Sequence, residues 1–260
     1  MNGFLFSLLV SASIWFTPTR TAMAEDVPDR PAPPVSGHVL ATPAVQEMQR
    51  DSFANPAQFW LERGQSAFSR VEGKAGKACA DCHGADDLGG AATTFPKVVD
   101  GALTALEGQI NRCRTLRMSA PALALGSEAM LSLMLAVRER SDGMPMAVRI
   151  DGAARPFFDR GRALYTERRG QMNLACFQCH DERVGLWLRG EQLTQGQTNG
   201  LPGYLLRWGE VGSVHRRFRF CDDQRLAEPG PLGSDDYLAL ELYTAWRGNG
   251  LPVEALAVRR

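Results

Sequence analysis

The chain carries apolar residues at helical spacing in two stretches, near residues 60–68 and 157–165. These residues recur every four positions: Trp60, Gly64 and Phe68 in the first stretch, and Phe157, Gly161 and Tyr165 in the second. Residues four apart lie on one face of an α-helix, so each stretch predicts a helix with one apolar face. The glycine within each face would let another helix approach closely.

A second helix is predicted later in each half, beginning after Ser127 and after Ser234. Acidic residues follow both serines, a combination typical of a helix N-terminus. Apolar residues then recur three and four positions apart: Met130, Leu133, Met134 and Val137 in the first helix, and Ala239, Leu242, Tyr243 and Trp246 in the second. No segment has a convincing strand pattern, so the sequence predicts a mainly α fold.

These helices belong to a repeat that runs through most of the chain. The two glycines lie 97 positions apart and the two serines 107, so about ten extra residues fall in the second half. Asp-Gly-Met-Pro-Met at 142–146 also matches Asn-Gly-Leu-Pro-Val at 249–253. A register this long predicts two copies of one fold, at residues 51–150 and 151–260.

Composition agrees with a folded protein and narrows the functional classes. Of the 260 residues, 44% are hydrophobic and 22% charged, which is ordinary for a globular protein. The 29 basic residues balance 29 acidic ones, which argues against a general nucleic-acid binder. Copies of about 100 residues with few helices have a thin core, so a bound group is expected to complete it.

The N-terminus has the pattern of a secretory signal peptide. Residues 4–16 form an uncharged apolar run of 13 residues, and Ala22-Met23-Ala24 provides a small-x-small cleavage pattern. We expect residues 1–24 to be removed, with cleavage after about Ala24, and the mature protein to be periplasmic without a membrane span. An uncleaved anchor is the alternative, because the run lacks a basic n-region. Residues 25–50 are rich in proline and predict an extended N-terminal arm.

Each predicted copy contains the attachment motif for c-type haem, Cys-x-x-Cys-His. In this motif two thiols form thioethers to haem and the adjacent histidine ligates the iron. The motif residues are Cys79, Cys82 and His83, and Cys176, Cys179 and His180. Redox or zinc sites are the alternative, although zinc would need further ligands from distant loops. The sequence thus predicts two tandem class I cytochrome c-like domains related by duplication, with two covalently bound haem c groups.

The two remaining cysteines, Cys113 and Cys221, lie 108 positions apart and so occupy equivalent places in the copies. They are the preferred sixth ligands, giving the sets His83/Cys113 and His180/Cys221. A disulfide between them and two inert buried thiols are the alternatives. In the second copy only His215 competes as a strong ligand, since no Met or Lys follows His180. In the first copy three methionines compete: Met118, Met144 and Met146.

Arginines surround Cys221 at positions 216, 217 and 219. Arg217 is four residues from the cysteine and shares a face with it on either a helix or a strand, whereas Arg219 does so only on a strand. Guanidinium groups lower the pKa of a neighbouring thiol and recognise sulfur or phosphorus oxyanions. A solvated basic surface beside Asp222 and Asp223 is the alternative.

These motifs resemble the SoxA family, the larger haem subunits of SoxAX cytochromes of periplasmic sulfur oxidation. The resemblance covers nearly the whole mature chain and includes both haem motifs, Gln-Ile-Asn-x-Cys-Arg at 109–114 and Arg-Phe-x-x-Cys-Asp at 217–222. It implies an L-cysteine S-thiosulfotransferase subunit that oxidatively couples thiosulfate to a cysteine of a SoxYZ-like carrier and passes electrons to cytochrome c. A SoxX-like monohaem subunit is the implied heterodimer partner.

The resemblance also implies roles for single residues. Cys221 would be the active-site cysteine, a persulfide that ligates the second haem, and Arg217 would bind substrate. Cys113 would be the axial ligand of the first haem. One rival function is a dihaem c-type electron carrier without substrate chemistry, which leaves the arginines beside Cys221 unexplained. A dihaem peroxidase is another, although it needs an iron with an open or displaceable ligand position.

Overall fold

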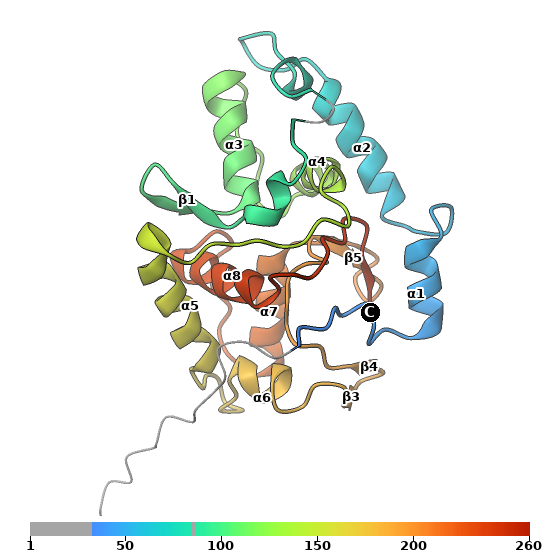
Figure 1. Ribbon diagram of the computed structural model, residues 1–260, viewed down its shortest axis with the longest axis vertical. Helices are drawn as coiled ribbons and strands as arrows, with labels where there is room; N and C mark the ends of the chain where they lie inside the picture. The colour runs from blue at the N-terminus through green and yellow to red at the C-terminus, as the bar shows by residue number, and fades with distance from the viewer. Residues whose placement is uncertain (1–32, 85–86) are drawn as a thin grey trace, which may run out of the picture.

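The computed structural model describes residues 33–84 and 87–260 (Figure 1). The predicted signal peptide, residues 1–24, lies outside these ranges. The helices are α1 Pro43–Arg50, α2 Gln58–Ser69, α3 Leu106–Arg117, α4 Glu128–Glu139, α5 Arg155–Thr166, α6 Cys176–His180, α7 Val214–Gln224 and α8 Asp235–Arg247. The strands are β1 Lys97–Val99, β2 Ala102–Thr104, β3 Trp187–Leu188, β4 Glu191–Gln192, β5 Gly203–Leu205, β6 Glu210–Gly212 and β7 Val258–Arg259. The mainly α class is confirmed, and the strands that the sequence did not reveal are two or three residues long.

Two helix crossings organise the two halves of the molecule. Helix α2 packs on α4 and α5 packs on α8, and each contact forms where a glycine faces the backbone of its partner. A Cβ atom on Gly64 would overlap the carbonyl oxygen of Ser132, and one on Gly161 would overlap that of Ala239. The close approach predicted from the glycines is therefore present in both halves.

The serines that precede α4 and α8 cap these helices as expected. The Ser127 side chain accepts a hydrogen bond from the backbone N–H of Met130, and the Ser234 side chain accepts one from that of Tyr237. Each cap satisfies a backbone donor that has no partner inside the helix. The helices thus begin at defined residues and present their apolar faces to α2 and α5.

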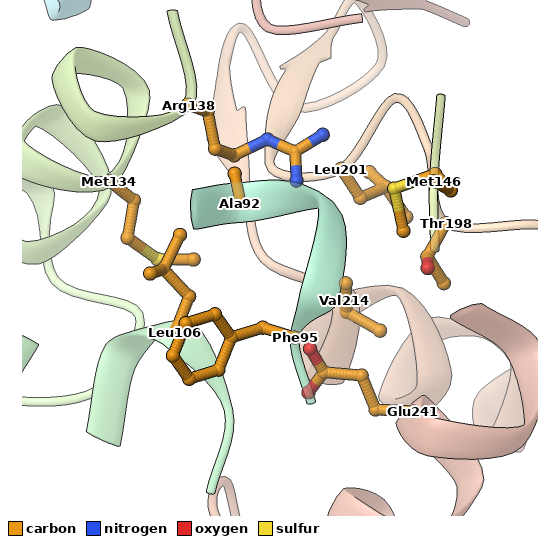
Figure 2. Close-up of a pocket in the computed structure, with 10 residues that line it drawn as sticks. All are labelled: Ala92, Phe95, Leu106, Met134, Arg138, Met146, Thr198, Leu201, Val214 and Glu241. Carbon is orange, nitrogen blue, oxygen red and sulfur yellow. The ribbon is translucent and has the colours of Figure 1, made fainter. Parts of the chain in front are cut away.

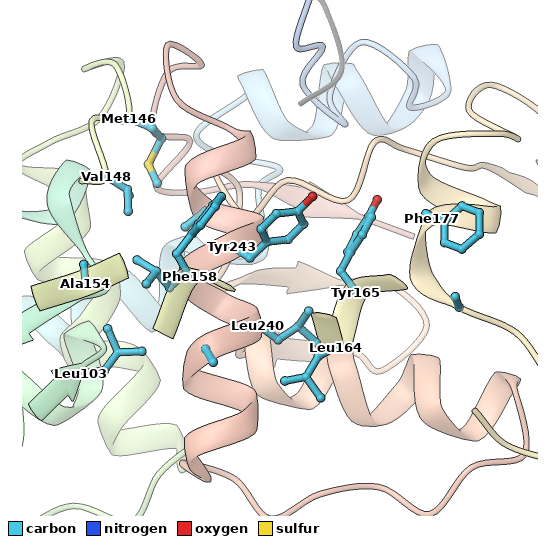
Figure 3. Close-up of a cluster of buried hydrophobic side chains, with 14 of the residues drawn as sticks. Leu103, Met146, Val148, Ala154, Phe158, Leu164, Tyr165, Phe177, Leu240 and Tyr243 are labelled. Carbon is cyan, nitrogen blue, oxygen red and sulfur yellow. The ribbon is translucent and has the colours of Figure 1, made fainter. Parts of the chain in front are cut away.

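The apolar stripes form two cores. One surrounds α4 and includes Met130 and Leu133, and the other surrounds α8 (Figure 3). In the second core the Tyr243 ring lies between Phe158 and Tyr165, with centroid separations of 5.4 and 5.1 Å. The aromatic residues of this core reach the helix α6 that carries the second haem motif.

The two matched Gly-x-Pro segments lie against each other between the halves. Pro145 and Pro252 form an antiparallel bridge. On either side, the N–H of Met146 donates to the Leu251 oxygen at 2.8 Å, and the N–H of Val253 donates to the Met144 oxygen at 2.8 Å. Segments at equivalent places in the predicted repeat therefore pair with one another.

A cavity of about 20 Å³ lies nearby, where side chains of both halves meet (Figure 2). Arg138 of α4 and Glu241 of α8 approach it from opposite sides. Burial lowers the pKa of Arg138 to about 10, and the charge of Glu241 opposes this effect. The interface between the halves thus contains buried charges as well as apolar contacts.

The predicted N-terminal arm is extended only in part. The described residues before Thr42 form no regular element, but Pro43 then opens helix α1. Proline suits the first turn of a helix because the N–H that it lacks would have no partner there. The arm lies on the second half, where the N–H of Val35 donates to Gln195 Oε1 at 2.6 Å. No helix in the described parts of the chain is long and apolar enough to cross a membrane.

Candidate functional site

The second Cys-x-x-Cys-His motif forms helix α6 and opens onto a large cavity. The cavity has a volume of about 690 Å³, within the range of small-molecule and cofactor sites. Cys176, Cys179 and His180 line it on one side, and Cys221 lines it from helix α7. The structure thus brings together the attachment cysteines, the histidine and the candidate sixth ligand of the second haem.

The orientation of His180 suits a metal ligand. Its Nδ1 lies 2.7 Å from the carbonyl oxygen of Thr194, so this nitrogen carries the proton and Nε2 is left free. Gly196 allows the same loop to pass closely, since a Cβ there would lie 3.1 Å from the imidazole ring. Burial lowers the pKa of His180, and the charges of Arg217 and Arg247 lower it further. The neutral imidazole needed for iron ligation is therefore favoured.

Helix α7 positions Cys221 and decides which arginine lies beside it. The helix begins after Ser213, whose side chain accepts a hydrogen bond from the N–H of Arg216. Because the segment is a helix, Arg217 shares the face of Cys221 and lines the cavity, whereas Arg219 is exposed. Arg216 forms an ion pair with Glu210 at 2.7 Å. Among the three neighbouring arginines, only Arg217 faces the cavity.

The Cys221 thiol lies in a mixed electrostatic environment. Burial raises its pKa, Arg217 and Arg225 lower it, and the Asp222 carboxylate raises it again. Asp222 is itself buried and accepts hydrogen bonds from Arg225 and from the Tyr237 hydroxyl, the latter at 2.6 Å. This ion pair anchors the end of α7 next to Cys221.

His215 lies away from the cavity, near the interface between the halves. Its Nε2 is 3.0 Å from Glu241 of α8, and its Nδ1 accepts a hydrogen bond from the N–H of Gly233 at 3.0 Å. It is not among the residues that line the cavity. The geometry therefore favours Cys221 over His215 as the ligand facing His180.

Sequence reasoning missed two residues at the cavity wall, Arg207 and Glu191. Arg207 lies on the turn between β5 and β6, and Glu191 begins β4. The Arg207 side chain donates a hydrogen bond to Glu191 Oε1 at 2.6 Å, and Arg217 lies 3.8 Å from the same oxygen. Neither residue is part of a motif, and only the folded chain brings them to Arg217.

The first haem motif has a comparable neighbour on helix α3. Cys79 lies in a short 3-10 turn, Cys79–Asp81, followed by Cys82 and His83. Burial raises the pKa of the Cys79 thiol, Arg114 lowers it, and the nearby Cys113 raises it again. Cys113 thus lies close enough to the first haem motif to affect the pKa of Cys79.

The competing methionines of the first half have other environments. Met118 and Met146 are only 3% and 4% exposed and belong to the packed interior, while Met144 is 41% exposed. No disulfide joins Cys113 to Cys221, an arrangement that was one of the alternatives for these two cysteines. In the described ranges no three His, Cys, Asp or Glu side chains cluster as a zinc site would require.

The second site as a whole fits a covalently bound haem. The cavity is large, its wall is mainly apolar, and it combines two thiols at attachment spacing with a histidine whose free nitrogen is fixed by a hydrogen bond. A family match covers the other half of the chain, which contains the first haem motif. The family description "SoxA/TsdA, cytochrome c domain" matches residues 63–146. A cytochrome c domain implies covalently bound haem c.

Relatives named "L-cysteine S-thiosulfotransferase subunit SoxA" decide the family. The protein of Rhodovulum sulfidophilum is 40% identical over 86% of this chain and 79% of its own length. That of Pseudaminobacter salicylatoxidans is 37% identical over 87% and 81%, respectively. The chain belongs to the SoxA family. It is thus an L-cysteine S-thiosulfotransferase subunit. The SoxA protein of Paracoccus pantotrophus is also similar, at 36% identity over 86% of this chain and 78% of its own length.

The fold of this SoxA family member agrees with a solved relative. The structure described as "Crystal structure of SoxXA from P. pantotrophus" matches with a TM-score of 0.84 at 36% identity. The match covers 87% of this chain and 87% of the other. Sequence and fold thus give the same assignment over nearly all of the described chain.

Proposed function

We propose that this SoxA chain oxidatively couples thiosulfate to a cysteine of a SoxYZ-like carrier protein. The observation that carries the proposal is the shared cavity, in which Cys221 and Arg217 face the haem-attachment residues Cys176, Cys179 and His180. A thiol, a guanidinium and the residues that would hold a redox cofactor therefore meet in one place. The electrons pass to a cytochrome c.

The proposal includes two tandem cytochrome c-like domains and two haem c groups. The matched crossings at Gly64 and Gly161 support a duplicated fold, as does the pairing of Pro145 with Pro252. The first haem would be held by Cys79, Cys82, His83 and Cys113, and the second by Cys176, Cys179, His180 and Cys221. Bound in this way, haem supplies a one-electron acceptor whose potential is lowered by an anionic sulfur ligand.

The residues of the chain have distinct roles in the proposed reaction. Arg217 binds the sulfonate group of thiosulfate through charge-assisted hydrogen bonds, and Cys221 provides the reacting sulfur at the site. Overall, one S–S bond forms between the carrier sulfur and the outer sulfur of thiosulfate. The carrier S–H bond breaks, and one proton and two electrons leave. The ion pair of Asp222 and Arg225 keeps the end of α7 in place while Cys221 reacts.

The same family supports proposals for the partner and the location of the protein. We propose a SoxX-like monohaem cytochrome as the second subunit of a heterodimer, supported by the SoxXA structure to which the chain is similar. We also propose that residues 1–24 direct the protein to the periplasm. The carrier would approach Cys221 through the opening of the cavity.

The test is thiosulfate-dependent reduction of cytochrome c by the haem-loaded complex, with and without the carrier protein. We expect reduction only when thiosulfate, the complex and the carrier are all present. Reduction of the haems by ordinary donors without any thiosulfate response would instead indicate an electron carrier. Turnover of peroxide would indicate a peroxidase.

A further inference from the structure

A second guanidinium stands beside Arg217 at the wall of the cavity. Arg207 comes from the β5–β6 turn and Arg217 from helix α7, and Phe220 lies against both. The guanidinium carbons lie 4.6 Å (Arg207) and 5.2 Å (Arg217) from the centroid of the Phe220 ring. One aromatic side chain thus holds two like charges near each other.

Both guanidinium groups have buried nitrogens that lack an acceptor within the described chain. These atoms are Nε of Arg207 and the terminal nitrogen Nη1 of Arg217. Buried donors in folded proteins nearly always have a partner, because removing a donor from water without a new acceptor is unfavourable. Both residues line the cavity, and their unsatisfied donors show that neither guanidinium is fully paired within the described chain.

Glu191 holds the two arginines from the other side. Its Oε1 accepts a hydrogen bond from Arg207 at 2.6 Å but lies 3.8 Å from Arg217, beyond hydrogen-bond range. Two positive charges therefore face a single negative one, so the group retains a net charge of one positive unit. A small oxyanion can bind to this group by charge and by hydrogen bonds together.

We infer that Arg207 is a second substrate-binding residue, which forms with Arg217 a paired guanidinium site for the sulfonate of thiosulfate. Glu191 is the internal counter-ion that keeps Arg207 in position and weakens binding of the incoming dianion. This inference rests on the proposed function, because it takes thiosulfate as the ligand. Beyond that function, it states that two arginines from separate elements together bind the negatively charged substrate.

The β3–β4 hairpin explains why Glu191 can act in this way. Leu188 pairs with Glu191 across the hairpin, and the turn residues Arg189 and Gly190 both have positive φ angles, 51° and 84°. The turn fixes the register of the two short strands, so it fixes the place from which Glu191 reaches Arg207. The counter-ion is therefore held by the backbone rather than by side-chain packing alone.

The experiment compares variants of the haem-loaded complex by two measurements. One is the thiosulfate KM for cytochrome c reduction with the carrier present, and the other is equilibrium binding of thiosulfate without the carrier. Arg207→Gln should raise KM and Kd roughly ten-fold or more, since a charged hydrogen bond contributes about 1.5–3 kcal/mol. Glu191→Gln should lower both values several-fold, because glutamine keeps the oxygen that accepts the hydrogen bond from Arg207 but removes the negative charge. Arg216→Gln is the matched control, because Arg216 pairs with Glu210 and does not line the cavity.

Several outcomes would overturn the inference. Unchanged KM and Kd in Arg207→Gln would do so. A changed haem absorption spectrum or reduction potential in Arg207→Gln, with an unchanged thiosulfate Kd, would also do so, because it would identify Arg207 as a partner of a haem propionate. If Arg207→Gln fails to assemble, Glu191→Gln decides alone, and a raised or unchanged Kd there contradicts the inference. A wild-type complex without any thiosulfate response would reject the proposed function itself. If Arg217→Gln weakens thiosulfate binding and Arg207→Gln does not, the inference about Arg207 is wrong but the proposed function stands.

Discussion

Single residues carry the chemistry of the site, and Arg217 is the simplest to test. It lines the cavity one helical turn from Cys221 and has a buried nitrogen without an acceptor in the described chain. Arg217→Ala should lower kcat/KM for thiosulfate by roughly 10- to 100-fold, because it removes a charge-assisted hydrogen bond to the substrate. Steady-state kinetics would measure this change. Arg219→Ala, at an exposed position on the same helix, should leave kcat/KM unchanged, and equal losses in both variants would contradict the assignment.

Glu107 provides a residue-scale prediction about pH. Burial and the Glu241 carboxylate together raise the pKa of Glu107 from 4.5 to about 7, although the charge of His215 opposes the rise. Burial alone would lower the pKa of His215, but Glu241 and Glu107 raise it overall. Folding thus favours the protonated form of both groups, so their contribution to stability is fully present at low pH and is lost as pH rises.

We therefore expect Glu107→Gln to reduce the loss of unfolding free energy between pH 4.5 and 7 by on the order of 2 kcal/mol. Glutamine imitates the neutral carboxyl group, so it does not titrate. Denaturant unfolding of the haem-loaded protein at several pH values would measure the difference. Glu62→Gln, the same substitution at an exposed position, is the control. A profile for Glu107→Gln that is as steep as that of the wild type would contradict the prediction.

At the scale of elements, the α2–α4 and α5–α8 crossings depend on their glycines. Gly161→Ala should destabilise the protein by about 3 kcal/mol or more, because the added methyl group overlaps the Ala239 carbonyl and forces the helices apart. Thermal or denaturant unfolding measures the loss. Ser66→Ala on the exposed face of α2 is the control and should change stability by less than about 0.5 kcal/mol. A stability of Gly161→Ala equal to that of the wild type would show that the crossing can adjust.

The helices that form these crossings could be predicted from sequence, whereas the strands could not. Gly64, Gly161 and the caps at Ser127 and Ser234 are local features with a regular spacing, so the chain itself reveals them. The strands are only two or three residues long and depend on contacts between distant segments, such as the parallel pairing of β5 with β7. Such pairs leave no periodic pattern.

The same distinction applies to the candidate site. The attachment cysteines, His180, Cys221 and Arg217 lie within motifs or at a helical spacing from one, so sequence reasoning could name them. Their roles remain predictions. Arg207 and Glu191 meet Arg217 only because a turn and a hairpin place them at the same cavity wall. No spacing along the chain connects these residues.

At the scale of the whole molecule, the repeat predicts that both halves bind haem. The intact mass of the mature protein should exceed that of its polypeptide by two haem groups, because each half contains two attachment thiols and a histidine. Replacing Cys79 and Cys82 with alanine should remove one haem and leave the other attached. Mass spectrometry and a haem assay would measure the number of attached haems. A single haem in the wild type would contradict the prediction that each half binds one.

The central claim is that Cys221 is the reacting sulfur of a thiosulfate-dependent transferase. The most direct test measures thiosulfate-dependent cytochrome c reduction by wild-type and Cys221→Ala complexes with the carrier present, after mass spectrometry has shown that both haems are attached. We predict that the wild-type complex turns over and that Cys221→Ala does not. Normal turnover by Cys221→Ala would contradict the claim.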